Sequence, residues 1–365
     1  MKTTFWEKNK RTICNLILVA VLVALVGCVD AFAPSSSMWF PVLRKVCTFA
    51  LAAVAMNLLN GFTGLFSLGQ AGFMLLGAYA YAILTIPVEL RSTVFRNYGD
   101  SLVQFQMPLV LALLAAGVVA AFFAFLIGLP VLRLKSDYLA IATLGFAEIV
   151  RGLVQLSQFG PLTNGPDPLN NFTAPKSVMP YAAIAGVCIL LIVLLINSTY
   201  GRAFKAIRDD EIAAGASGLN TTYLKVLVFA ISAFFAGIAG GIFAQYIGSL
   251  NPTMAGWLNS INYVIMVVFG GMGSLTGSIV SAIGLTILPE LLRAFADYRM
   301  LAYSVVLVLV MIFRPQGIFG SWEFSLPRLV NRMLFRGAAG KGAKPAASAK
   351  QHDQSDDKTV KEASR

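Results

Sequence analysis

The chain has 365 residues, of which 57% are hydrophobic and only 12% are charged. Soluble domains carry about 25% charged residues, so this composition excludes an ordinary soluble protein and indicates a polytopic membrane protein. The apolar runs are long and continuous, which argues against a β-barrel. The net charge of +11 requires no nucleic acid as partner, because cytoplasmic loops and anionic membrane lipid both favour basic residues.

Ten apolar runs follow one another along the chain, and each predicts a helix. The predicted fold class is therefore an all-α polytopic membrane protein with about ten transmembrane helices, at least one of them Gly-broken or re-entrant. The runs at 259–272 and 275–288 are both short, and the joint MGSLTGS is uncharged, so they form either one broken helix or a re-entrant hairpin. The ten runs are 13–33, 42–60, 64–86, 107–130, 138–157, 180–197, 224–248, 259–272, 275–288 and 300–313.

The distribution of Lys and Arg predicts the orientation. Most of the 28 basic residues fall on one side when the N-terminus is cytoplasmic, as the positive-inside rule requires. This predicts a cytoplasmic N-terminus at 1–12 and a single permease domain at 13–320, with a cytoplasmic loop at 198–223. A cytoplasmic tail follows at 321–365, disordered from about 336. Residues 1–28 also resemble a signal peptide, so either a retained first helix or a removed leader fits.

Residues for catalysis, metal binding or nucleotide binding do not cluster in the sequence. The four cysteines are widely spaced, and the only histidine, His352, lies in the tail, so no metal site is expected. The string FGGMGSLTGS at 269–278 lacks the lysine of a phosphate-binding loop. We expect a non-catalytic chain that binds no cofactor, with any ATP hydrolysis on another polypeptide.

One cytoplasmic loop, 201–220, carries many charges between apolar runs. Apolar and small residues recur in it at helical spacing, which predicts one short amphipathic helix stopped by Gly215 and Gly218. Such a helix suits docking into the groove of a partner. The alternative is a helix folded against its own protein.

Two polar groups fall at membrane depth. Asn57, Asn60, Thr63, Ser67 and Gln70 alternate with glycines between 57 and 72. Irregular backbone at this depth is tolerated only inside protein or beside water, so this segment either lines a translocation path or is a packing hinge.

Glu148 and Arg151 form the second group, since they lie three residues apart in the run 138–157 and share one helical face. One interpretation is that they make a polar contact, either in the transport path or with a partner subunit. The alternative is a structural ion pair near the membrane interface. The next loop, 159–172, is rich in Pro, Gly and Asn, which predicts a rigid periplasmic cap or docking surface.

Six blocks of sequence resemble one known family. They include NLLNGFTGLFSLGQAG, LTNGPDPL, GRAFKAIRDDEIAAGASGLN and IFRPQGIFG, and they run from about 42 to 320. They are similar to the permease subunits of bacterial branched-chain amino acid ABC importers, of the LivM type. The resemblance implies a multi-pass subunit of the inner membrane. It also implies four kinds of partner: a LivH-like second permease, two cytoplasmic ATPases of the LivG and LivF type that hold ATP and Mg, and a periplasmic substrate-binding protein.

The resemblance further implies that the loop 202–218 is the ATPase-coupling loop, in which closure of the ATPases would push on Phe204, Ile207 and their neighbours. One departure is GPDP, with Asp167 and Pro168, where many relatives read GPNG. A branched-chain amino acid (Leu, Ile or Val) is the expected substrate. Urea, short amides or small carboxylates are the alternatives within the class, and a self-sufficient secondary transporter is the alternative outside it. The expected coupling residues are Arg202, Phe204, Ile207, Arg208, Asp209, Glu211, Ala214, Gly215 and Gly218.

Overall fold

The structure is a computed structural model that describes residues 39–98, 102–134, 136–175, 177–295, 298–314 and 317–318. The predicted N-terminal segment 1–12, the first run 13–33 and the tail 321–365 lie outside these residues. Within the described ranges the chain is helical, and its one β contact is an isolated antiparallel bridge between Leu169 and Leu250.

The helices follow the apolar runs closely. Short 3₁₀ turns, labelled η, extend or connect several of them. The elements are α2 (Trp39–Asn60), α3 (Gln70–Thr85), η1 (Val88–Leu90), α4 (Arg91–Val94), α5 (Leu109–Val131), α6 (Ser136–Gln155), η2 (Ser157–Phe159), α7 (Gly160–Thr163), α8 (Met179–Asn197), α9 (Thr199–Asp209), α10 (Glu211–Ala216), α11 (Thr221–Ile247), η3 (Pro252–Ala255), α12 (Trp257–Gly270), α13 (Leu275–Leu291), η4 (Leu292–Phe295) and α14 (Arg299–Phe313).

Five of the described helices, α2, α5, α6, α8 and α11, are long and apolar enough to cross a membrane. A sixth span is possible if α3 is joined to Val88–Val94, across a bend of 101°. Helices α12 and α13 are apolar but shorter. The prediction of an all-α polytopic membrane protein is confirmed.

The predicted run 64–86 is wrong at its start. Residues 61–69 are not helical, and α3 begins only at Gln70. Gly64 has a φ of +73°, a left-handed conformation that ends a helix and that residues with a Cβ rarely adopt. Hydropathy cannot detect such a break, because the residues in it are as apolar as those of a helix.

The pair 259–272 and 275–288 proves to be two helices, α12 and α13, which pack against each other across a four-residue turn. Gly271 and Gly273 in the turn have φ values of +108° and +84°. Gly270 and Gly277 bring the two helix backbones into close approach, since a Cβ on either would overlap the carbonyl oxygen of the other. The segment is therefore a helical hairpin, not one broken helix.

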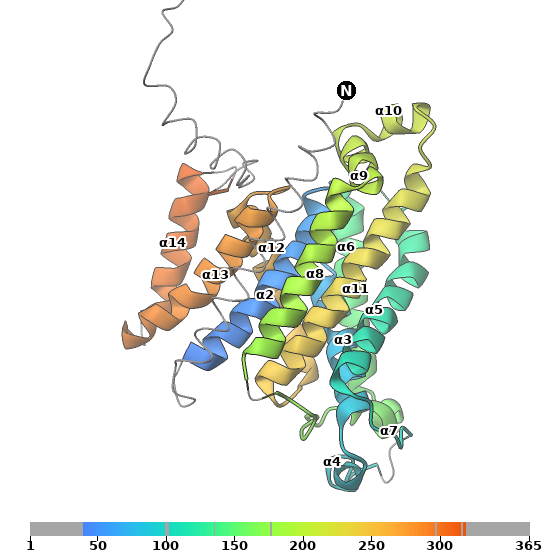
Figure 1. Cartoon of the computed structure of the whole chain (residues 1–365), viewed down its shortest axis with the longest axis vertical. Helices are drawn as coiled ribbons and strands as arrows, with labels where there is room; N and C mark the ends of the chain where they lie inside the picture. Colours follow the sequence, from blue (N-terminus) through green and yellow to red (C-terminus); the bar gives the residue numbers. More distant parts are fainter. Residues whose placement is uncertain are drawn as a thin grey trace, which may run out of the picture. The chain divides into compact units, whose positions relative to one another are not determined.

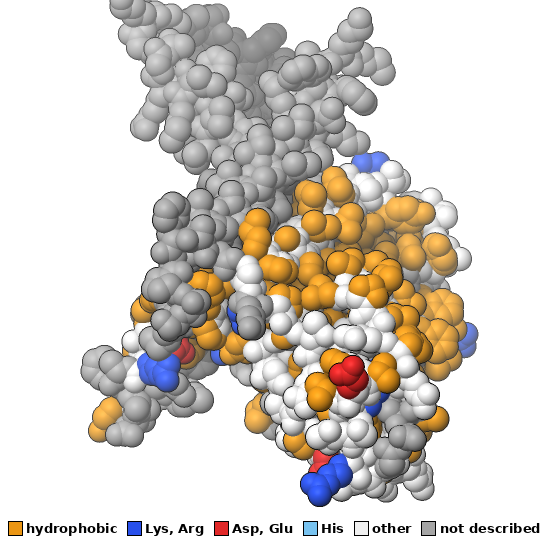
Figure 2. All heavy atoms as spheres, turned by 60° about the horizontal axis from the view of Figure 1, so that its bottom comes forward, with side chains coloured by type: hydrophobic (Ala, Val, Ile, Leu, Met, Phe, Trp, Pro, Cys, Tyr) orange, Lys and Arg blue, Asp and Glu red, His pale blue; other side chains and the backbone are white. Residues whose placement is uncertain are grey.

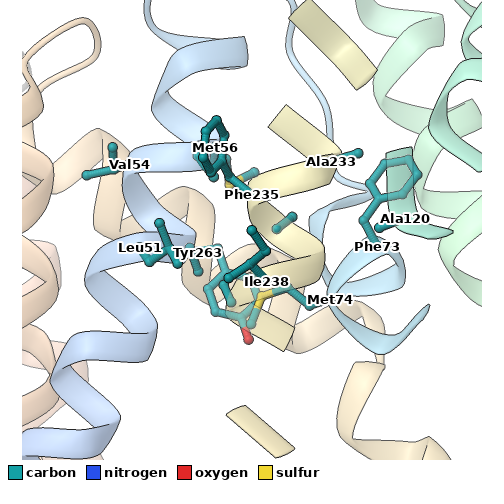
Figure 3. Packing of buried hydrophobic residues seen from close by; sticks show 14 of the residues in the cluster. Leu51, Val54, Met56, Phe73, Met74, Ala120, Ala233, Phe235, Ile238 and Tyr263 are labelled. Atoms are coloured by element: carbon teal, nitrogen blue, oxygen red, sulfur yellow. The ribbon is translucent and has the colours of Figure 1, made fainter. Parts of the chain in front are cut away.

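The core forms around α11 and α2, which pack against each other (Figure 1). Helix α11 also packs against α3 and α5, and α2 also packs against α8 and α13. Side chains from these helices and from α12 fill it, among them Met56, Phe73, Phe235 and Tyr263 (Figure 3). Glycines allow the closest contacts: a Cβ on Gly77 of α3 would overlap the carbonyl oxygen of Gly237 of α11.

The outer surface of the bundle is strongly apolar. Helices α5 and α6 are only 33% buried in their most apolar windows, against 72% for α2 and α11. Figure 2 shows hydrophobic side chains spread over the side of the bundle, with few charged groups among them. Exposed apolar area of this kind is what lipid or another membrane subunit covers.

Candidate functional site

The loop between α8 and α11 forms two helices, not the single helix expected from its spacing. Helix α9 ends at Asp209 and α10 begins at Glu211. Between them Asp210 has extended backbone, and its carboxylate accepts hydrogen bonds from the backbone N–H groups of Ile212 (2.8 Å) and Ala213 (3.0 Å). Asp210 is thus an N-cap, which starts a new helix where the periodicity alone would continue the old one.

Helix α9 turns its apolar face inward. Phe204 is fully buried and Ile207 is 5% exposed, and α9 packs against α8 and α11. Gly201 permits the sharp turn out of α8, since a Cβ there would overlap the carbonyl oxygen of Ile196. These two side chains therefore anchor the loop to its own bundle. That the ATPases push on them stays a prediction.

Helix α10 turns outward. Ile212 is 85% exposed, whereas Ala214 is only 5% exposed. Gly215 and Gly218 have open space around them, and Gly218 has a φ of +85° and ends the helix. Glu211 pairs with Lys225 at the start of α11. Helix α10 is thus a short, exposed element that its neighbours hold in place, at the end of the bundle opposite α4 and α7 (Figure 1).

Arg208 connects this loop to the interior. Its Nη1 donates a hydrogen bond to the carbonyl oxygen of Gly61, 3.2 Å away, while Nη2 contacts Oδ1 of Asp209 at 2.9 Å. Gly64 and Gly273 lie against the same side chain: added Cβ atoms would lie 2.9 Å from Cγ and 3.2 Å from Nη1 of Arg208. The loop therefore contacts both non-helical segments of the bundle, residues 61–69 and the α12–α13 turn.

Asn57, near the end of α2, holds the α12–α13 turn and the start of α13 from inside. Its Nδ2 donates to the carbonyl oxygen of Ser274 and to Oγ of Ser278, both at 2.8 Å, and its Oδ1 accepts from the N–H of Gly273 at 2.9 Å. The side chain is completely buried. All of its strong hydrogen-bonding positions but one lone pair are used within the chain.

The other polar residues of this region are also buried and bonded within the chain. Asn60 and Ser67 bond each other across the break, with Ser67 N–H donating to Asn60 Oδ1 at 3.3 Å. Thr63 donates to the carbonyl oxygen of Leu58 at 3.1 Å, and Gln70 to that of Ala52 at 3.5 Å. These hydrogen bonds stabilise the non-helical backbone of residues 61–69 inside the bundle. A role of these residues in a translocation path stays a prediction.

Glu148 and Arg151 form the ion pair that their spacing allows. Arg151 Nε donates to Oε2 of Glu148 at 2.6 Å, and the two side chains are 35% and 30% exposed respectively. Both line a cavity of about 610 Å³ between α6, η3 and the start of α12. The structure thus brings the pair next to residues about 110 positions away in sequence, which the spacing could not indicate.

The loop 159–172 is held by many contacts. Leu169 pairs with Leu250, Asp167 Oδ2 accepts from Asn97 at 2.8 Å, and Thr163 donates to the carbonyl oxygen of Val154 at 2.9 Å. Gly160 lies so close to the ring of Tyr98 that a Cβ would overlap it. Such a loop is a well-defined surface; its role as a docking surface stays a prediction.

Sequence reasoning missed Arg91, which begins the short helix α4 and is only 4% exposed. Its guanidinium donates to the carbonyl oxygens of Ile83 (3.1 Å), Ile86 (3.2 Å) and Phe105 (2.8 Å), and also to that of Val103. It fixes the bend after α3 to the segment that leads into α5. The only hint in the sequence was an arginine shortly after the apolar run 64–86.

Taken together, a helical membrane bundle with Gly-broken segments and a short exposed loop helix defines a membrane transport subunit. Residues 38–314 match the family described as branched-chain amino acid transport system / permease component, and the chain belongs to this family. It is 34% identical over 328 residues to the high-affinity branched-chain amino acid transport system permease protein LivM of Escherichia coli (80% of this chain, 71% of that protein).

Two further relatives support the same family. The LivM protein of Salmonella typhimurium is 35% identical over 304 residues, which cover 74% of this chain and 67% of that protein. The high-affinity branched-chain amino acid transport system permease protein LivH of the same organism is 23% identical over 292 residues, 76% of this chain and 92% of that protein. No solved structure matches.

Proposed function

We propose that this chain is the pore-forming permease subunit of an ATP-driven importer that moves branched-chain amino acids from the periplasm to the cytoplasm. The match of residues 38–314 to the permease family carries this proposal, and relatives named LivM support the substrate class. The subunit itself is non-catalytic and lies in the inner membrane, with both termini cytoplasmic. ATP and Mg bind to two separate ATPase subunits of the LivG and LivF type.

The similarity to both LivM and LivH supports a LivH-like second permease as the membrane partner. A periplasmic binding protein delivers substrate on the side of the loop 159–172. Asp167 and Pro168 lie in that loop, at the point where this chain departs from many relatives. The binding protein of a relative is therefore a poor guide to the binding protein of this chain, which is best identified from the neighbouring genes.

The loop of α9 and α10 is the ATPase-coupling loop. We assign contact with the ATPase to α10, because Ile212 is 85% exposed while Phe204 of α9 is fully buried. Movement of the ATPases would displace α10, and α9 would pass the displacement through Arg208 to Gly61 and the α12–α13 turn. The energy comes from the ATPases, and this chain only transmits it.

Affinity purification of the tagged chain from solubilised membranes, with mass spectrometry of the co-purifying chains, tests this function. We expect an ATPase and a second permease to co-purify with the chain. We also expect the assembled complex to take up leucine. Ile212→Asp should lose the ATPase but keep the second permease. Leu102→Asp is the matched control, since Leu102 is 75% exposed and its backbone N–H bonds to the carbonyl oxygen of Pro161 in α7. Helix α7 lies at the end of the bundle opposite α10 (Figure 1).

Other results would point elsewhere. A chain that purifies alone and transports on its own would replace the importer with a secondary transporter. An importer that takes up urea, short amides or small carboxylates but not leucine, isoleucine or valine would keep the subunit role and change the substrate. Retention of the ATPase by Ile212→Asp would contradict the assignment of α10.

A further inference from the structure

The cavity beside Glu148 and Arg151 has the size of a small-molecule site. Its volume of about 610 Å³ falls within the range of roughly 300–1,000 Å³ typical of ligand pockets. It lies where α6, η3 and the start of α12 meet, away from the α9–α10 loop. The cavity is not lined by Arg208, Asn57 or the α12–α13 turn. The coupling role proposed for those residues therefore does not explain the cavity.

The cavity wall carries one positive and one negative group side by side. Arg151 uses Nε for its bond to Glu148, and in the described part of the chain its two terminal nitrogens make no hydrogen bond that would compete with a ligand. Arginine presents these nitrogens in a fork that matches a carboxylate. Glu148 offers the complementary charge for an ammonium group. A ligand that carries both groups on one carbon would contact both residues at once.

The rest of the wall suits an aliphatic group. Leu144 and Leu258 line the same cavity, together with the amide side chains of Asn259 and Asn262. Leu258 is 61% exposed, so its side chain is available to a ligand. A cavity with an ion pair on one side and leucines on another distinguishes an amino acid with an apolar side chain from one with a charged side chain.

We propose that this cavity is a substrate site for zwitterionic α-amino acids with aliphatic side chains. Arg151 binds the α-carboxylate, Glu148 binds the α-ammonium group, and Leu144 and Leu258 contact the side chain. The inference rests on the proposed function, because it takes an amino acid as the substrate. When the site is empty, the two residues pair with each other, which lowers the cost of holding both charges at membrane depth. Substrate must replace the ion pair between Glu148 and Arg151 when it binds. Its affinity is therefore low enough for it to be released from the site.

Charge variants separate a substrate site from a merely structural ion pair. The purified importer, reconstituted in proteoliposomes with excess binding protein, is assayed for leucine uptake and for the yield of assembled complex. Glu148→Gln and Arg151→Gln should each lower uptake by about tenfold or more, as expected for loss of a charged hydrogen-bonding partner, with unchanged yield. Glu290 and Arg293 give the control: they form a pair of the same i, i+3 spacing at 2.9 Å that does not line this cavity. Glu290→Gln and Arg293→Gln should keep normal uptake.

The exchanged variant, Glu148→Arg with Arg151→Glu, decides the case if a single change lowers the yield. It restores an ion pair but reverses the charges that the substrate meets. The proposal expects recovered yield with uptake still low. Recovered uptake, or single variants within twofold of the unmodified importer, would overturn the site. If the unmodified importer takes up none of leucine, isoleucine and valine, the proposed function fails instead.

Discussion

Arg208 and Gly61 are separated by 147 positions in the sequence, yet Arg208 Nη1 donates a hydrogen bond to the Gly61 carbonyl oxygen at 3.2 Å. Gly61 directly follows the end of α2, so its carbonyl oxygen lacks the partner that a continuing helix would supply. The bond therefore satisfies the end of a core helix from the exposed loop. The bond links α9 directly to the Gly-broken segment.

We predict that Arg208→Ala uncouples the importer. A hydrogen bond from a charged donor contributes about 1.5–3 kcal/mol at most, and Arg208 is partly exposed, so the fold should survive while leucine uptake falls several-fold with the ATPase still bound. Uptake and ATP hydrolysis are measured on the same proteoliposomes. Arg133→Ala is the control, because Arg133 is an exposed arginine in the turn after α5 and is not among the expected coupling residues. Equal uptake in both variants would exclude a coupling role for Arg208.

We predict that Asp210→Ala weakens the attachment of the ATPase. Loss of an N-cap costs a helix about 0.5–2 kcal/mol, which is a large loss for a helix of only six residues such as α10. Faster amide hydrogen exchange in 211–216 and less co-purified ATPase are expected. Asp210→Asn should restore both, since asparagine also caps helices well. If Asp210→Asn also loses the ATPase, the negative charge of Asp210 is what the attachment requires, and not its capping hydrogen bonds.

Gly77→Ala should destabilise the bundle strongly. The added Cβ would overlap the backbone oxygen of Gly237, and a backbone atom cannot rotate away as a side chain can. Overpacking of this kind costs about 1–3 kcal/mol or more. Thermal unfolding in detergent should begin at a clearly lower temperature. Gly152→Ala is the matched control, since a Cβ there meets nothing within 4 Å. Two variants of equal stability would show that α3 and α11 pack less tightly than described.

Asn57→Ala should also lower the stability, because it removes three hydrogen bonds and leaves the N–H of Gly273 without its acceptor. Each unsatisfied buried group costs about 1–3 kcal/mol. Asn197→Ala is expected to have a small effect, since Asn197 bonds only to Val193 of its own helix among the described residues. Thermal unfolding compares the two. An Asn57→Ala variant with normal stability and altered transport would favour the translocation path over the packing hinge.

Local features of the sequence predicted much of this structure. The apolar runs placed most helices to within a few residues, and the spacing of Glu148 and Arg151 predicted their ion pair. The two errors arose where hydropathy carries no information about backbone conformation. Residues 61–69 are apolar enough for a helix, but Gly64 leaves the helical conformation. In the loop, the periodicity continued past Asp210, while its carboxylate began a second helix.

The sequence by itself determined the class of protein, the positions of the spans and the family, because these depend on composition, local periodicity and short motifs. Only the tertiary structure decided that Phe204 faces inward and Ile212 outward, that Arg208 reaches Gly61, and that Glu148 and Arg151 share a cavity with Leu258. Those relationships depend on how helices distant in sequence pack together. Close approach at glycines and buried hydrogen bonds set that packing, and neither has a signature in the residues taken one segment at a time.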